Sequence, residues 1–435
     1  MEGLRRSHIF AATIGNALAF YDFLIYALFA IQIGRAFFPS SSAIASLMLS
    51  LGTFGAGFLT RPLGAVVIGR YADRVGRRPA MVLCLLLLGF SITLVALVPP
   101  YRMIGPLAPV LLVLARTTQG FGLGGEVGAN TAYLMEAARD RSRGVVVAWQ
   151  GSSQYIALIA GSLVGVVLTT VMPAASLESY GWRIAFLLGA ATVPFGYVMR
   201  RRLPETLQAA GSGTDAPAPG AANLPAPATV RGHLRIMFLG LVVLSAGTIG
   251  SYILNYIVTY AQNTLHLPAR AGFIASLAAY LVSAPLMLYG GHLSDRVGRW
   301  HVNVWGNLAL LLAIYPVFAW VAAAPSTLSL TLGMMLLGGI ANFPSAAFYA
   351  ALAEALPQNI RSTGFATVYA LALACFGGTT QLVVTWLIHV TGSALAPAWY
   401  LTGATAIGQI GYMLFPETAP VRLQHRHHGT SSVAS

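Results

Sequence analysis

The sequence predicts an all-α membrane protein in which twelve transmembrane helices form two six-helix halves. Charge is scarce: of the 435 residues, 9% are charged and 57% are hydrophobic, whereas soluble globular proteins carry about 25% charged residues. Long apolar runs recur along the chain, and two motifs of its first part return in its second part. A chain this poor in charge must face lipid over most of its outer surface.

The apolar runs fix the type and number of the expected elements. A membrane-spanning helix needs about 20 apolar residues, and in hydrocarbon every backbone polar group must be paired within helices or a closed barrel. The runs are continuous rather than alternating, as in Met81–Val98, which favours helices. The expected spans are residues 9–34, 46–71, 79–98, 107–136, 145–171 and 183–200, followed by 235–260, 270–292, 301–323, 327–354, 363–390 and 396–415.

The basic residues predict the orientation of these spans. All of them are arginine, and most lie in alternate loops, a bias typical of cytoplasmic loops. We therefore expect a multi-pass protein of the bacterial inner (plasma) membrane with both termini in the cytoplasm. The net charge of +13 indicates no nucleic-acid partner, because the arginines do not form one basic face. The loop arginines are Arg5 and Arg6; Arg74, Arg77 and Arg78; Arg139, Arg141 and Arg143; Arg200, Arg201 and Arg202; and Arg296 and Arg299.

A change of composition divides the chain. Prolines, glycines and alanines dominate the segment between the sixth and seventh spans, a composition typical of a flexible linker. The expected organisation is an N-terminal six-helix half (1–200), a cytoplasmic linker (201–232), a C-terminal six-helix half (233–418) and a disordered cytoplasmic tail (419–435).

The two halves carry the same motifs at nearly the same offset. Gly69 to Arg78 reads Gly-Arg-Tyr-Ala-Asp-Arg-Val-Gly-Arg-Arg, and Gly291 to Arg299 reads Gly-His-Leu-Ser-Asp-Arg-Val-Gly-Arg. A glutamate also precedes an arginine by seven positions after the fourth and tenth spans, as Glu136 with Arg143 and Glu354 with Arg361. A duplicated six-span unit is an architecture of transporters, whose substrate site lies between the halves near the midplane.

The repeated Gly-x-x-x-Asp-Arg-x-Gly-Arg loop resembles the signature of the major facilitator superfamily. More narrowly, the chain resembles the metabolite:proton symporters, and the run from Thr379-Thr380-Gln381 to His389 is most similar to citrate and related carboxylate members. The narrower resemblance rests on Gly15-Asn16, Asp22-Phe23, Arg61-Pro62-Leu63-Gly64, Arg116, Gln119-Gly120-Phe121, Gly124-Gly125-Glu126, Arg361-Ser362-Thr363-Gly364 and Phe376-Gly377-Gly378. One departure is Ala19, where members of the family commonly carry a glutamate.

The resemblance implies the major facilitator fold and a proton-coupled symporter that imports a small organic anion by alternating access. A di- or tricarboxylate such as citrate is the expected substrate. A betaine or proline symporter, and an exporter working by proton antiport, are the alternatives. The exporter branch usually has a Gly-Pro pair in its fifth span, and the stretch from Gly151 to Gly165 contains no proline.

Four charges are expected inside the membrane, where charges are costly and mark functional sites. They are Asp22, Arg61, Arg116 and Glu126. A carboxylate that alternates between a dry site and a nearby arginine can take up and release a proton, so Asp22 and Glu126 are the candidate proton-coupling residues. The alternative is a permanent salt bridge. Arg116, Gln119 and Glu126 share one stripe of their helix, which is expected to line the cavity.

The candidate substrate-binding residues combine these arginines with uncharged polar groups. Arg61 and Arg116 need an acidic partner, which is either a substrate carboxylate or a structural ion pair. Asparagine, glutamine and tyrosine can bind a ligand, but they also serve contacts between helices. The candidates are Arg61, Arg116, Gln119, Tyr26, Asn342, Tyr349 and Gln381.

The repeated charged loops imply gates. In the resembled family they act as cytoplasmic latches, with the aspartate facing a helix N-terminus and the arginine pairing with acids across the interface between the halves. Their simpler role is to set topology. The candidate gating residues are Asp73, Arg77, Asp295, Arg299, Glu136, Arg143, Glu354 and Arg361.

Other site classes are not indicated. The run Gly120-x-Gly122-x-Gly124-Gly125 follows no strand and lies in an apolar span, so it predicts close helix packing rather than dinucleotide binding. The sequence shows no arrangement of a nucleophile and a base, no metal-ligand spacing and no ATP-binding loop. We expect a transporter rather than an enzyme, with no metal or cofactor, functional as a monomer, with protons, a small organic anion and the lipid bilayer as its partners.

Overall fold

The structure, a computed structural model, describes residues 17, 20–21, 23–137, 143–201, 230–356 and 361–419. Within these ranges, the side chains at positions 73, 77, 127–137, 143–152, 230, 361–363 and 366 lie outside the description. All regular elements in the described ranges are helices. Ten of these helices are long and apolar enough to cross a membrane.

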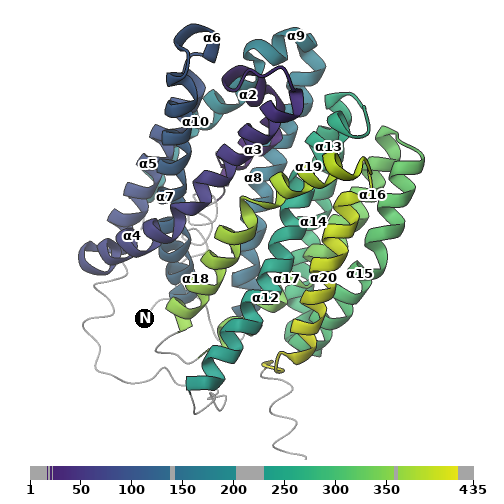
Figure 1. Cartoon of the computed structure of the whole chain (residues 1–435). Helices are drawn as coiled ribbons and strands as arrows, with labels where there is room; N and C mark the ends of the chain where they lie inside the picture. Colours follow the sequence, from purple (N-terminus) through teal and green to yellow (C-terminus); the bar gives the residue numbers. More distant parts are fainter. Residues whose placement is uncertain are drawn as a thin grey trace, which may run out of the picture.

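The helices form two groups (Figure 1). Those up to α10, the first half, gather on one side, and those from α12 onward, the second half, gather on the other. The first half comprises α2 (Ala30–Phe37), α3 (Ala43–Leu59), α4 (Arg61–Val75), α5 (Arg77–Leu97), α6 (Tyr101–Ile104), α7 (Leu107–Ala137), α8 (Arg143–Val171), α9 (Ala174–Ser176), η2 (Leu177–Gly181) and α10 (Trp182–Arg201). The second half comprises α12 (Val230–Asn255), α13 (Ile257–Asn263), α14 (Ala269–Val297), α15 (Arg299–Ala323), α16 (Thr327–Asn342), α17 (Ser345–Ala355), α18 (Arg361–Ala372), η3 (Leu373–Gly377), α19 (Thr380–Thr391) and α20 (Ala396–Leu414).

The all-helical membrane fold predicted from the sequence is confirmed. Each expected span from 46–71 to 396–415 coincides with one helix or with two consecutive helices, except that 363–390 coincides with α18, η3 and α19. The first expected span, 9–34, lies partly outside the described residues, and α20 is not among the ten long apolar helices. The count of twelve spans therefore stays a prediction. The predicted linker (201–232) and tail (419–435) lie almost entirely outside the described residues.

Glycines bring α7 against α3 and α4. A Cβ atom placed on Gly120 would lie 1.6 Å from the carbonyl oxygen of Gly57, and one on Gly124 would lie 2.0 Å from that of Arg61. Only a residue without a side chain permits so close an approach of two backbones. The prediction that this glycine run packs helices together is confirmed.

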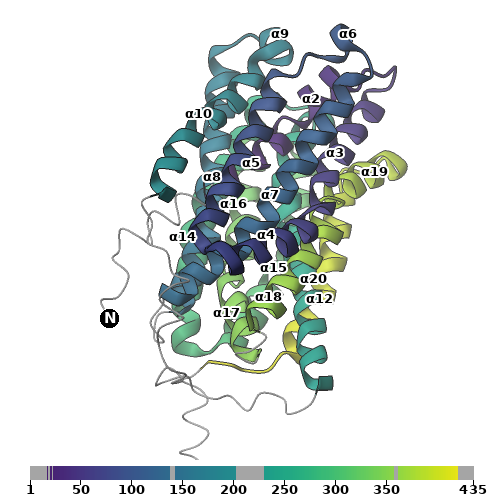
Figure 2. The ribbon, with the colours of Figure 1, turned by 90° about the vertical axis from the view of Figure 1, so that its left-hand side faces the viewer.

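The two halves meet along several helices. The helix α8 of the first half packs along α14 of the second, and α3 packs against η3 and α19. A Cβ atom on Gly165 of α8 would lie 2.1 Å from the ring of Phe273 on α14, and one on Gly378 would lie 2.6 Å from the Cα atom of Gly55. The view turned by 90° shows α8 and α14 close together on its left-hand side (Figure 2). One buried apolar cluster draws residues from both halves, from Phe20 to Leu401.

Several spans are interrupted near candidate site residues. The second span breaks at Thr60, so that Arg61 is the first residue of α4, with Pro62 in the first turn. The tenth span breaks after Asn342, the last residue of α16. A π-helical turn, η3, precedes Gln381 in the eleventh span. Such breaks are tolerated in a membrane where they line a cavity or are buried in protein.

Candidate functional site

A cavity of about 90 Å³ lies between the two halves. Its wall combines α8 of the first half with α12, α14, α16, α17 and α18 of the second. The side chains are rich in hydroxyl and amide groups, and none of the lining residues, all in the described part, carries a charge. Six tyrosines line it: Tyr155, Tyr252, Tyr280, Tyr349, Tyr369 and Tyr412. Of the candidate substrate-binding residues, Asn342 and Tyr349 lie in this wall.

Arg61 lies in an aromatic pocket beside the cavity. Its side chain is buried, with 4% exposed, and its guanidinium carbon lies 4.3 Å from the ring centre of Phe23 and 4.2 Å from that of Phe58. These are cation–π contacts, which are strengthened where water is excluded. Its Nε and Nη2 atoms have no hydrogen-bond partner among the described residues.

Arg116 shares this pocket. Its guanidinium carbon lies 4.4 Å from the ring centres of Phe23 and Tyr26, and its Nη1 donates to the Oε1 of Gln119. The hydroxyl of Tyr26 in turn donates to the carbonyl of Ser50, at 3.3 Å. The structure therefore brings together four candidate substrate-binding residues: Arg61, Arg116, Gln119 and Tyr26.

Tyr252 joins this pocket to the cavity. It lines the cavity from α12, and its ring packs at 5.4 Å on that of Phe58. Its hydroxyl interacts with the guanidinium of Arg61. Gln381, a further candidate, donates from Nε2 to the carbonyl oxygen of Tyr252 at 3.5 Å. Tyr252 of the second half thus contacts both Arg61 and the cavity.

Glu126 does not belong to the aromatic pocket of Arg61 and Arg116. Both of its carboxylate oxygens bind Arg200 of α10, at 2.6 and 2.8 Å, and the two side chains are 0% and 1% exposed. Arg200 also donates to the carbonyl of Met81. None of Arg116, Gln119 and Glu126 is among the residues that line the cavity described above. Glu126 lies about 10 Å further along the helix than Gln119, where α7 packs against other helices of the first half.

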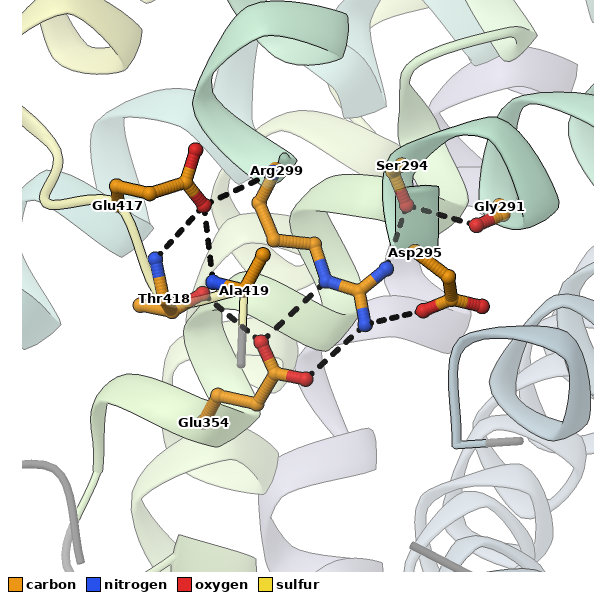
Figure 3. A network of polar contacts seen from close by, with 8 residues as sticks. All are labelled: Gly291, Ser294, Asp295, Arg299, Glu354, Glu417, Thr418 and Ala419. Atoms are coloured by element: carbon orange, nitrogen blue, oxygen red, sulfur yellow. Dashed lines mark hydrogen bonds and ion pairs between the residues drawn. The ribbon is translucent and has the colours of Figure 1, made fainter. Parts of the chain in front are cut away.

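Arg299 is the centre of a second charged network (Figure 3). It binds Asp295 at 2.6 Å and Glu354 at 3.1 Å. The carboxylate of Glu417, after α20, accepts the backbone N–H groups of Arg299 and Trp300, at 2.9 and 3.1 Å. Thr418 donates to Glu354 at 2.8 Å. A carboxylate at this position satisfies the free N–H groups and the dipole of the α15 N-terminus.

The network bears on the predicted latches. Three candidate gating residues, Asp295, Arg299 and Glu354, lie together, but these partners all belong to the second half, so the described contacts of Arg299 do not cross the interface. The residue that faces the N-terminus of α15 is Glu417 rather than an aspartate of the loop. The side chains of Asp73, Arg77, Glu136, Arg143 and Arg361, and all of Asp22, lie outside the described residues.

Sequence reasoning missed three kinds of site residue. Arg200 was expected in a cytoplasmic loop, because it stands beside two other arginines. Nothing in the sequence marks Glu417 as a site residue except its position directly after the last span. Tyr155 and Tyr252 were overlooked because tyrosine is common in apolar helices, although Gln154-Tyr155 is a polar pair within an apolar run.

The chain is 36% identical over 404 residues to a citrate-proton symporter of Salmonella typhi, covering 92% of this chain and 91% of that protein. It is 30% identical over 432 residues to a glycine betaine/proline/ectoine/pipecolic acid transporter of Dickeya dadantii (strain 3937), covering 96% and 84%.

The fold is similar to that of solved transporter structures. The crystal structure of a D-xylose-proton symporter has a TM-score of 0.77 at 17% sequence identity, covering 95% of this chain and 98% of that one. The family model of the Major Facilitator Superfamily matches residues 10–380. The family predicted from the repeated loops is thereby confirmed, and the chain belongs to the Major Facilitator Superfamily, with a citrate-proton symporter among its relatives.

Proposed function

We propose that this protein is a proton-coupled symporter that imports a di- or tricarboxylate such as citrate across the bacterial inner membrane. It works by alternating access, as a monomer, with both termini in the cytoplasm. The likeness to a citrate-proton symporter over 92% of the chain supports this proposal. The observation that carries it is that two buried N–H groups of Arg61 have no acceptor among the described residues.

Arg61 offers two N–H groups, on Nε and Nη2, that no described residue accepts. Leaving buried donors of a charged group unsatisfied is costly, and a carboxylate matches the planar fork of a guanidinium. The cavity lies beyond Tyr252, which interacts with Arg61 and lines the cavity. A substrate carboxylate that displaces the hydroxyl of Tyr252 would reach Arg61 directly. Arg116 supplies a second positive charge to the same aromatic pocket.

Anion import requires protons. The membrane potential opposes the entry of each negative charge by about 2.3 kcal/mol per 100 mV, so the protons taken up must at least neutralise the substrate. Asp22 and Glu126 were the candidates. Because both oxygens of Glu126 are held by Arg200, we assign the proton to Asp22. Its neighbour in the chain, Phe23, lies against both Arg61 and Arg116.

The second network supports a cytoplasmic latch. The contacts of Arg299 tie α14, α15, α17 and the segment after α20 into one unit of the second half. We propose that Asp295, Arg299 and Glu354 hold this end of the second half together, and that the network rearranges when the halves rock.

A zwitterion symporter is the second candidate function. It is favoured by the relative from Dickeya dadantii and by the six tyrosines of the cavity. Aromatic rings attract quaternary ammonium groups such as that of betaine.

The test is uptake of labelled citrate into proteoliposomes, with and without an inward proton gradient, beside competing carboxylates, betaine and proline. We expect uptake that the gradient drives and that carboxylates block. Arg61→Met should abolish it, whereas Arg70→Gln, an exposed arginine at a variable position of the motif on the same helix, should leave it intact. Entry of betaine or proline, with no carboxylate entering or competing, would refute the carboxylate assignment and favour the second candidate.

A further inference from the structure

One hydrogen bond in the cavity wall joins the two halves. The hydroxyl of Tyr155, on α8 of the first half, donates to the Oδ1 atom of Asn342, on α16 of the second. Both residues line the cavity, and Asn342 is 4% exposed. The ring of Tyr155 packs beside that of Tyr280, with 6.1 Å between their centres. The bond therefore lies where a substrate held between the halves would meet both.

The orientation of the Asn342 amide is fixed by its other partners. Its Nδ2 atom lies 2.8 Å from the carbonyl oxygen of Gly338 and 3.2 Å from the Oγ of Ser283. A carbonyl oxygen can only accept, and the hydroxyl of Ser283 already donates to the carbonyl of Ala279 at 2.8 Å. Both partners thus require an N–H donor, so the group that Asn342 turns to Tyr155 is an acceptor and nothing else.

An acceptor of this kind is a poor partner for a carboxylate, which when ionised has no hydrogen to donate. The Tyr155 hydroxyl is different, because its hydrogen can turn from Asn342 toward another acceptor. If it turns to a substrate carboxylate, the Oδ1 of Asn342 loses its donor. A buried acceptor without a partner costs free energy, unless the substrate itself brings an O–H group to that place.

We propose that Tyr155 and Asn342 together recognise a hydroxyl group beside a carboxylate, so that the protein selects hydroxycarboxylates. Tyr155 donates to the carboxylate and the Oδ1 of Asn342 accepts from the hydroxyl. This inference rests on the proposed function, and it assigns a specificity to a residue pair of the same cavity. Betaine, which has neither an O–H nor an N–H group, leaves Asn342 without a partner.

The test compares two acids that differ in one group. Citrate and propane-1,2,3-tricarboxylate share three carboxylates, and only citrate has a hydroxyl. Binding to the purified full-length protein is measured by displacement of labelled citrate in detergent. We expect citrate to bind about 5- to 150-fold more tightly, the range for a buried acceptor that is left unsatisfied. Equal affinity of the two acids for the unaltered protein would overturn the inference while leaving the proposed function intact.

Two variants separate the roles of the pair. Asn342→Ala should reduce the preference for citrate to within about 2-fold, because the acceptor is gone. Tyr155→Phe should weaken both acids by a similar factor and keep the preference. Asn307→Ala removes another buried amide, which binds the Oε1 of Gln409 at 2.8 Å outside the cavity, and should change neither affinity.

The two variants also define the results that would overturn the inference. A preference that survives Asn342→Ala, or that disappears in Tyr155→Phe alone, would overturn the assignment. If Asn342→Ala does not fold, the unaltered protein and Tyr155→Phe still provide the test. Absence of any binding of labelled citrate that excess unlabelled citrate can displace would instead refute the proposed function.

Discussion

The buried pair of Glu126 and Arg200 should be far more important for stability than an ion pair at the surface. Two short hydrogen bonds, of 2.6 and 2.8 Å, join side chains that water does not reach. Glu126→Leu leaves the guanidinium of Arg200 buried without its carboxylate. Arg200→Met leaves a carboxylate that can become neutral by taking up a proton. The first change should therefore be the more damaging.

The expected magnitude follows from the burial. Removing one partner of a buried ion pair costs about 3–5 kcal/mol, whereas replacing both with apolar residues is often close to neutral. With an unfolding entropy of about 2.1 cal/mol/K per residue over 435 residues, that loss lowers the midpoint of thermal unfolding by roughly 3–5 °C. The double variant Glu126→Leu/Arg200→Met should recover more than half of it.

The assay is thermal unfolding of the purified protein in detergent, arranged as a double-mutant cycle. The exposed pair of Arg35 and Glu178 is the control, since these side chains are 53% and 49% exposed. Glu178→Gln should cost at most about 1 kcal/mol. A Glu126→Leu variant as stable as the unaltered protein, or a double variant no more stable than that single one, would refute the reasoning.

The same variants decide the role of Glu126 in transport. If the pair is structural, the double variant regains uptake driven by the proton gradient together with its stability. If Glu126 carries the proton, the double variant is stable but loses the response to the gradient. That second result would return the proton-coupling role to Glu126.

Two further changes test the packing and the cytoplasmic network. Gly165→Ala places a Cβ atom 2.1 Å from the ring of Phe273, which is fully buried, so we expect a loss of about 1–3 kcal/mol and slower uptake in proteoliposomes. Gly161→Ala, whose nearest contact is 3.2 Å, should be much milder, and equal effects would contradict the close approach of α8 and α14. Glu417→Ala removes the acceptor for two N–H groups at the start of α15. It should cost about 0.5–2 kcal/mol in thermal unfolding, and an unchanged midpoint would show that the cap is dispensable.

The helices were predictable because hydrocarbon allows few alternatives. An apolar run that must pair its own backbone becomes a helix, and the expected boundaries of most spans agree with the structure within a few residues. The breaks within spans were not predicted. The backbone after Asn342 departs from a regular helix because of Pro344 and the packing around it, and the mean hydropathy of a run carries no sign of such a break.

The site was predictable only in part. Arginines within apolar runs stand out in a sequence, and Arg61 and Arg116 do lie together. Their partners did not stand out, because partners are set by how helices pack. Gln119 and Glu126 lie on one stripe of α7. Gln119 binds Arg116, one turn back on the same helix, whereas the partner of Glu126 is Arg200 of another helix, α10. Periodicity predicts which residues share one face of a helix. Which other helix packs against that face at a given depth in the membrane is known only from the fold.

The two charged networks are both built from arginine and carboxylate side chains, but they differ in how deeply these side chains are buried. Glu126 and Arg200 are sealed, with both oxygens of the carboxylate on one guanidinium, so separating them would leave a charge in a dry interior at a cost of several kcal/mol. Around Arg299 the acids are 14% and 23% exposed, and it has several partners. Water and alternative partners can compensate there when a contact opens. A pair that must break in every transport cycle belongs in the second setting, which is why the gating role is proposed for Arg299 and not for Arg200.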